Sequence, residues 1–263
     1  MDSKYLGSRE KICLNIVMID TYVINLDRQI ENYSRVENAM NELGGFNVHR
    51  VSAVDGKKGE HLPLVDSETT WLCKQTCPDS IIAIALSHKK VAQMILDSGV
   101  DYALVMEDDA IPIKDDFHKK LQRTLTEVPK DWDIINLYCD GFICKPNMNN
   151  SYLSGSFAAY LISKKGAKKM TNLNIYTHID KQTHFNFKKY KSPENLFITD
   201  ESESTNGADA LSLSIKLKQK IVNDEKIPKT NFIKLFGFNW VLDDFINFVI
   251  YLFGFAIILL CKL

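Results

Sequence analysis

The sequence lacks an excess of charge of either sign. Its 263 residues include 32 Lys and Arg against 33 Asp and Glu, which gives a formal net charge of -1. Proteins that bind nucleic acid or an acidic membrane surface through their overall field carry a clear excess of Lys and Arg. We therefore expect no nucleic-acid partner, although local basic patches remain compatible with this composition.

A cysteine pattern that would bind metal is also missing. The six cysteines form neither a C-x-x-C pair nor the spacing of a zinc finger. We expect most of them to be ordinary buried thiols. Two close pairs leave a disulfide open, Cys73 with Cys77 and Cys139 with Cys144, and a disulfide would favour an oxidising compartment.

The N-terminus does not have the form of a signal peptide. Residues 1–10 are polar and charged, and the apolar run at 12–19 is interrupted by Asn15 and ends at Asp20. We expect no signal peptide, and therefore a main domain that stays in the cytosol.

The C-terminal end contains one long hydrophobic run. Residues 245–261 read FINFVIYLFGFAIILLC, and Asn247 is the strongly polar residue among them. This length is near the lower limit for a membrane-spanning helix, and Trp240 stands where an interfacial anchor would. We expect a C-terminal hydrophobic helix that serves as a tail anchor in a membrane. The alternative is a helix that packs on the domain.

Strand-like and helix-like segments alternate along the chain. This alternation predicts an α/β fold with a mainly parallel sheet flanked by helices, and a ligand site beyond the carboxyl ends of the strands. The expected strands are 16–26, 46–53, 102–106, 132–138 and 157–163, the expected helices 29–43, 80–98, 114–126 and 164–172, and residues 55–78 and 193–231 are expected loops. The predicted division is an extension at 1–18, a domain at 19–205, a polar linker at 206–240 and the hydrophobic helix at 241–263.

Three acidic residues directly follow the apolar strand predicted at 102–106. In extended backbone Glu107 and Asp109 would project to one side and Asp108 to the other. Two carboxylates at a strand end can share Mg²⁺ or Mn²⁺ with the oxygens of a diphosphate. By itself such a triplet is a weak signal, because carboxylates at a strand end usually face water.

The neighbouring motifs make this signal specific. In their order and spacing they resemble glycosyltransferase family 25, the group that includes lipopolysaccharide glycosyltransferases and collagen β-galactosyltransferases. The resemblance covers roughly residues 20–205 and rests on residues 22–28 with Arg35, on 51–56, on 83–88 with 104–109, and on 155–166 followed by Ile179 and Asp180.

The resemblance implies a GT-A-like (Rossmann-like) fold, a nucleotide-sugar donor such as a UDP-sugar, and Mn²⁺ or Mg²⁺ as the cofactor. It assigns the metal to Glu107 and Asp109. His178 and His184 are alternative additional ligands. The catalytic set that it implies is Asp180, His88 and Asp109, and the donor-binding set is Asn25, Arg28, Asp55, Gly56, Ser87 and Asp108.

One departure from the family concerns the helix before the acidic strand. Where the family has Gly-Cys, this chain has Ala83-Ile84, which leaves less room for a close backbone approach. We predict a metal-assisted hexosyltransferase that moves galactose or glucose to a glycan, or to a hydroxyl of a protein or lipid, near a membrane. The alternatives are an inactive, membrane-anchored nucleotide-sugar-binding module and a metal-dependent phosphohydrolase.

Overall fold

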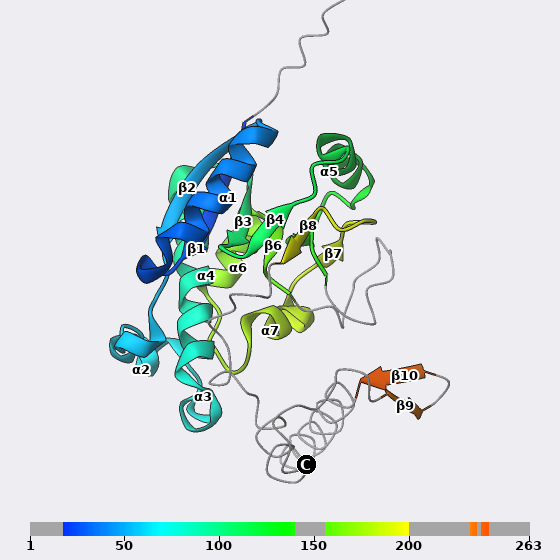
Figure 1. Cartoon of the computed structure of the whole chain (residues 1–263). Coiled ribbons are helices and arrows are strands. Elements are labelled where there is room, and N and C mark those ends of the chain that lie inside the picture. The colour runs from blue at the N-terminus through cyan, green and yellow to red at the C-terminus, as the bar shows by residue number, and fades with distance from the viewer. Residues whose placement is uncertain (1–17, 140–155, 200–231, 236–237, 242–263) are drawn as a thin grey trace, which may run out of the picture.

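The computed structural model describes residues 18–139, 156–199, 232–235 and 238–241 (Figure 1). Six of the described strands form one central sheet in the order β2-β1-β3-β6-β5-β7. Strand β6 pairs antiparallel with both of its neighbours, and the other pairs in the sheet are parallel. The strands are β1 (Ile19–Asn25), β2 (Phe46–Ser52), β3 (Tyr102–Glu107), β5 (Ile134–Asn136), β6 (Ala159–Ser163) and β7 (Lys189–Lys191).

Helices cover both faces of this sheet. Alternate residues of β3 enter different cores, since Val105 packs in one hydrophobic cluster and Leu104 and Met106 pack in the other. The first cluster receives helices α4 (Asp79–Ser98), α6 (Lys164–Thr171) and α7 (Ile179–Asn186), and the second receives α1 (Ile30–Leu43) and α5 (Phe117–Glu127). The predicted α/β class with a mainly parallel sheet between helices is confirmed.

Two further ladders are formed by short strands that the sequence does not predict. Residues 197–199 fall in the predicted loop, residues 232–235 and 238–240 fall in the predicted linker, and residues 110–112 were assigned to no element. Strand β4 (Ala110–Pro112) pairs antiparallel with β8 (Phe197–Thr199), and β9 (Phe232–Leu235) pairs antiparallel with β10 (Phe238–Val241). Strands of three or four residues are too short to show a clear alternation of apolar and polar residues, which is the signal that identifies a strand.

The segment expected as a loop at 55–78 contains short helices. They are the 3-10 turns η2 (Gly56–Lys58) and η3 (Leu62–Leu64) and the helices α2 (Val65–Glu68) and α3 (Trp71–Thr76). Each is about one turn long, so none displays the repeat of apolar residues that marks a longer helix.

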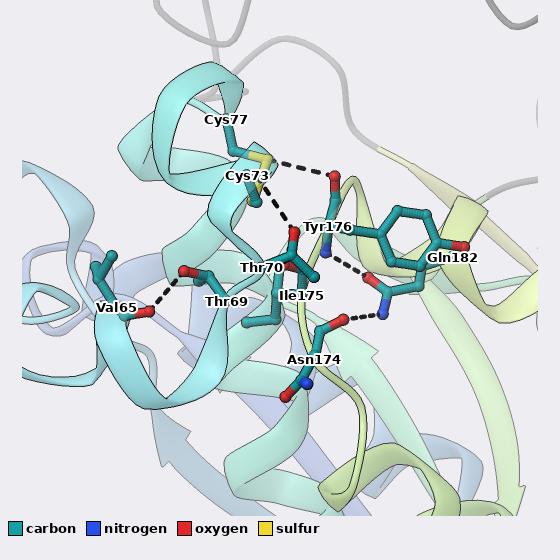
Figure 2. The surroundings of a disulfide bond; sticks show 9 residues. All are labelled: Val65, Thr69, Thr70, Cys73, Cys77, Asn174, Ile175, Tyr176 and Gln182. Atoms are coloured by element: carbon teal, nitrogen blue, oxygen red, sulfur yellow. Dashed lines mark hydrogen bonds between the residues drawn. A yellow bond between two sulfur atoms is a disulfide. The ribbon is translucent and has the colours of Figure 1, made fainter. Parts of the chain in front are cut away.

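Figure 2 shows how helix α3 is attached to the rest of the domain. Cys73 and Cys77 form a disulfide, which is one of the two pairings that the sequence leaves open. The amide of Thr70 donates to the carbonyl of Ile175 at 2.9 Å, and Sγ of Cys77 lies 3.7 Å from the carbonyl oxygen of Tyr176. Cys139 is disulfide-bonded as well, to a cysteine outside the described residues.

The described part of the chain contains no helix that is both long and apolar enough to cross a membrane. The predicted tail anchor at 245–261 lies outside the described residues, as do the extension at 1–17 and residues 206–231 of the predicted linker.

Candidate active site

A cavity of about 360 Å³ lies beyond the carboxyl ends of β1, β2 and β3. This volume is within the range of small-molecule sites, and the position is where α/β sheets commonly bind ligands. Its walls come from the segments that follow β1 and β2, from the first half of α4 and from the end of β3. The lining residues fall within 24–29, 53–57, 78–88 and 107–108.

The first turn of α4 forms one wall of the cavity. Asp79 and Ser80 line it, and the amide groups at a helix N-terminus favour an anionic ligand. Gly56 packs directly against this turn, because a Cβ atom there would lie 3.1 Å from the carbonyl oxygen of Asp79 and 3.2 Å from the Cβ atom of Ala83. Glycine therefore allows the turn after β2 to approach α4.

Ser87 links the segment after β2 to helix α4 through hydrogen bonds. Its Oγ accepts a hydrogen bond from the amide of Val54 at 2.9 Å and donates to the carbonyl of Ala83 at 2.8 Å. The residue was predicted to bind the donor. It does line the cavity, but its hydroxyl already makes two hydrogen bonds within the protein.

Arg28 and Asp55 form an ion pair in the cavity wall. The Asp55 carboxylate also accepts the amide of Lys57 at 3.0 Å. Burial raises the pKa of Asp55, but the hydrogen bonds from Arg28 and from the Lys57 amide outweigh this effect and leave that pKa below its ordinary value. The pair is therefore charged at neutral pH, and the Arg28 side chain, 34% exposed, remains open to the cavity.

The acidic residues do not continue the strand as expected. Strand β3 ends at Glu107, and Asp108 and Asp109 form a turn. The alternation that would place Glu107 and Asp109 on one side requires extended backbone, so it ends at Glu107. Glu107 and Asp108 line the cavity, and Asp109 is not among the lining residues.

Asn25 holds the side chain of Asp108 in place through a hydrogen bond. Its Nδ2 donates to Oδ2 of Asp108 at 2.6 Å and to the carbonyl of Gln29 at 2.8 Å, while its Oδ1 accepts from Nε of Arg50 at 2.8 Å. Asn25 is 1% exposed and does not line the cavity. Asn25 was predicted to contact the donor. In the structure it supports Asp108, whose carboxylate does line the cavity.

Asp109 carries the strongest electrostatic signal of the three acids. Burial, followed by the nearby charges of Glu107 and Asp108, raises the pKa of Asp109 to about 7. Its Oδ1 atom is buried and has no hydrogen-bond partner within the described residues. A divalent cation would relieve both the mutual repulsion and the missing partner, and oxygen donors suit Mg²⁺ or Mn²⁺.

The predicted metal site requires two carboxylates, with diphosphate oxygens completing the shell. In the described ranges no group of three or more His, Cys, Asp and Glu side chains is arranged to hold a metal ion.

His88 connects the cavity with the core. Its Nδ1 lies 2.9 Å from the hydroxyl of Tyr160, and its Nε2 lies 3.4 Å from Oε1 of Glu107. The ring meets the edge of Phe157, with centroids 5.4 Å apart. Sequence reasoning placed His88 in the site but gave no role to Tyr160 or Phe157, although both lie in the segment 155–166 on which the resemblance rests.

Asp180 lies outside the cavity lining. It begins α7, where its Oδ1 accepts the amide of Lys181 at 2.8 Å and its carbonyl accepts Nζ of Lys189 at 3.0 Å. His178 and His184 are not lining residues either. The structure thus brings together Arg28, Asp55, Gly56, Ser87, His88, Glu107 and Asp108, places Asn25 and Asp109 beside them, and leaves Asp180 apart.

Comparison with known proteins identifies a family for most of this region. Residues 18–183 match the model of a family described as glycosyltransferase family 25 (LPS biosynthesis protein). No curated protein sequence matches the chain.

Solved structures give weaker similarity. A glycosyltransferase involved in glycosylation of the major capsid of PBCV-1 has 10% identity and a TM-score of 0.43, with 71% of this chain and 94% of that chain covered. An active-site mutant of LgtC has 10% identity and a TM-score of 0.39, with 66% and 72% covered.

Proposed function

The chain belongs to glycosyltransferase family 25, and from this premise we propose that it transfers a hexose, galactose or glucose, from a nucleoside diphosphate sugar to an acceptor hydroxyl. The acceptor is a saccharide, or a hydroxyl group of a protein or lipid. The observation that supports this proposal most is that seven residues, predicted from three separate motifs, line one cavity of about 360 Å³. A cavity of this size can enclose much of a nucleotide sugar.

The positive groups of the cavity suit the diphosphate of the donor. Arg28 and Lys57 line it together with the N-terminal turn of α4. Guanidinium groups and helix N-termini are common partners of phosphate oxygens. We place the diphosphate between these groups and the acidic turn.

The acidic turn is the proposed position of Mn²⁺ or Mg²⁺, with Glu107 and Asp109 as its protein ligands. A cation bound there would offset the charge that develops on the diphosphate as the glycosyl bond breaks. Asn25 orients Asp108 through its 2.6 Å hydrogen bond, and His88 contacts Glu107. Each of the two carboxylates that line the cavity therefore has a hydrogen-bonding partner within the protein.

The acceptor side is proposed from the family motif. Asp180 is the candidate base or orienting group for the acceptor hydroxyl, at the start of α7. A membrane-bound acceptor would be consistent with the apolar run at 245–261, which we propose as a tether.

The test is sugar transfer by the purified full chain from UDP-galactose and UDP-glucose, with Mn²⁺ and with a chelator. Glu107→Gln is expected to lower kcat/KM by about 100-fold or more, because it removes a charge that acts in the transition state. Glu127→Gln is the matched control, since Glu127 is a surface carboxylate of α5 that pairs with Arg123.

Three outcomes separate the alternatives. Transfer that is unaffected by chelator and by Glu107→Gln would refute the metal-assisted mechanism. Donor binding without turnover across an acceptor panel would favour the binding module, and hydrolysis of simple phosphate esters without use of sugar donors would favour the phosphohydrolase.

A further inference from the structure

A chain of hydrogen-bonding groups runs from the core to the wall of the cavity. Tyr160 of β6 is fully buried, His88 of α4 is 1% exposed, and Glu107 stands at the end of β3. The hydroxyl of Tyr160 lies 2.9 Å from Nδ1 of His88, and Nε2 of His88 lies 3.4 Å from Oε1 of Glu107. Both ring nitrogens of His88 therefore face a defined partner.

Aromatic packing keeps these rings in place. Phe157 stacks on Tyr160 with centroids 4.3 Å apart, and the His88 ring lies 5.4 Å from Phe157 and 5.7 Å from Tyr160. Packing thus sets the orientation of the imidazole, whereas its hydrogen bonds determine which ring nitrogen carries the proton.

For a neutral His88 ring, the two contacts favour one direction of proton donation. Burial, with a smaller effect from the charge of Glu107, raises the pKa of Tyr160 well above its ordinary value, so the phenol keeps its proton. A neutral imidazole has one donor and one acceptor nitrogen, and a carboxylate can only accept. If Nδ1 carried the proton, the lone pair of Nε2 would face the oxygen of Glu107, which is repulsive.

We propose that Tyr160 is a positioning residue of the proposed transferase site, whose hydroxyl donates to Nδ1 of His88 and thereby fixes its proton on Nε2, toward Glu107. This inference rests on the proposed function. The Nε2 proton holds one oxygen of Glu107 against the cavity wall and leaves the second oxygen for the donor side. Groups that orient a ligating side chain in this way commonly affect metal binding or activity.

The direct test is ¹⁵N NMR of the full chain with labelled histidine. Tyr160→Phe removes the hydroxyl but keeps the ring that stacks on Phe157. In the wild type we expect His88 to show a protonated Nε2 and an unprotonated Nδ1. In Tyr160→Phe we expect the two shifts to move toward each other as both tautomers become populated. The chain has six histidines, and the signals lost in His88→Gln assign the ring.

Kinetics provide the second measurement. Tyr160→Phe is expected to lower kcat by about 10- to 100-fold, with little change in the KM of the donor, because the donor contacts are retained. Tyr33→Phe is the matched control, since the Tyr33 hydroxyl bonds to Glu37 within α1, away from the cavity. We expect that variant to change neither kcat nor the His88 signals.

Two results would overturn the proposal. One is a wild-type His88 that carries its proton on Nδ1, and the other is a set of ring shifts that Tyr160→Phe leaves unchanged, even if kcat falls. The NMR readout does not depend on turnover. An absence of sugar transfer by the wild type would therefore count against the proposed function, while the tautomer measurement would still decide the assignment of the hydrogen bonds.

Discussion

The cavity beside β1, β2 and β3 and the region around α7 differ in how their polar residues are placed. In the first region three parallel strands end at the same edge, and polar residues follow each strand directly. In the second, β6 runs in the opposite direction and Asp180 lies on a helix rather than at a strand end. Parallel strands bring residues together by topology, whereas a residue on a helix depends on how the helix packs.

The two regions meet at Phe157. The centroid of its ring lies 5.4 Å from the ring centroid of His88 and 4.9 Å from Nζ of Lys189. Lys189 in turn donates to the carbonyl of Asp180. Lys189 is 2% exposed, and this burial lowers its pKa to about 8. Substitution of Asp180 tests whether α7 and the cavity form one active site.

The largest expected effect is that of Asp180→Asn. If Asp180 accepts the proton of the acceptor hydroxyl, this variant should lower kcat by about 100-fold or more while the KM of the donor stays near the wild-type value. Steady-state kinetics at saturating donor would measure it. Asp131→Asn is the matched control, because Asp131 is a surface carboxylate that pairs with Lys188. A wild-type kcat in Asp180→Asn would show that the two regions are not one site.

The sequence predicts the first region well for a physical reason. The segments that form β1, β2 and β3 show the apolar runs or the alternation of apolar and polar residues that identify strands in a sequence. Polar residues that follow parallel strands lie at the same edge of the sheet. The family resemblance assigned Arg28 and Asp55 to the donor site, and the end of an apolar strand marked Glu107. The expectation that Asp109 projects to the same side of a strand as Glu107 was wrong, because the turn after β3 is set by backbone geometry rather than by a repeat of residue types.

The second region and the segment between β2 and α4 were harder to predict. The 3-10 turns and helices at 56–76 are too short to show a period, and the Cys73–Cys77 pairing could not be distinguished from free thiols by spacing alone. Tyr160 lies in the motif at 155–166, but nothing in that segment distinguished it from the other residues of the strand. Its contact with His88 joins residues 72 positions apart, which no local signal reports.

The next largest effect concerns the disulfide of helix α3, which lies beside Tyr176 in the segment before α7. The amide of Thr70, at the start of helix α3, bonds to the carbonyl of Ile175, and residues 78–80, which follow Cys77, line the cavity. Replacement of both Cys73 and Cys77 by Ser should lower the free energy of unfolding by about 2 kcal/mol, as expected for a short closed loop. We also expect weaker donor binding, because residues 78–80 are then less ordered.

Urea unfolding and donor titration measure these two effects. Reductant added to the wild type should lower the unfolding midpoint more than reductant added to the double variant, whose remaining response reports the disulfide at Cys139. Equal midpoints for the wild type and the double variant would show that the cross-link does not stabilise the domain.

The smallest expected effect is an acid sensitivity of α7 that the cavity does not share. Burial, followed by the charge of Lys189, lowers the pKa of His184 to about 4. Between this value and the ordinary pKa of 6.5 the unfolded chain binds the proton more strongly, so the contribution of His184 to stability is present above pH 6.5 and is lost as the pH falls toward 4. From pH 7 to 5.5 the loss should be about 1 kcal/mol. Urea unfolding at both pH values should show that the wild type and His118→Gln, whose imidazole is at the surface, lose about 1 kcal/mol more stability than His184→Gln over this range. If His184→Gln kept the wild-type dependence, the acid sensitivity would have to come from groups outside α7.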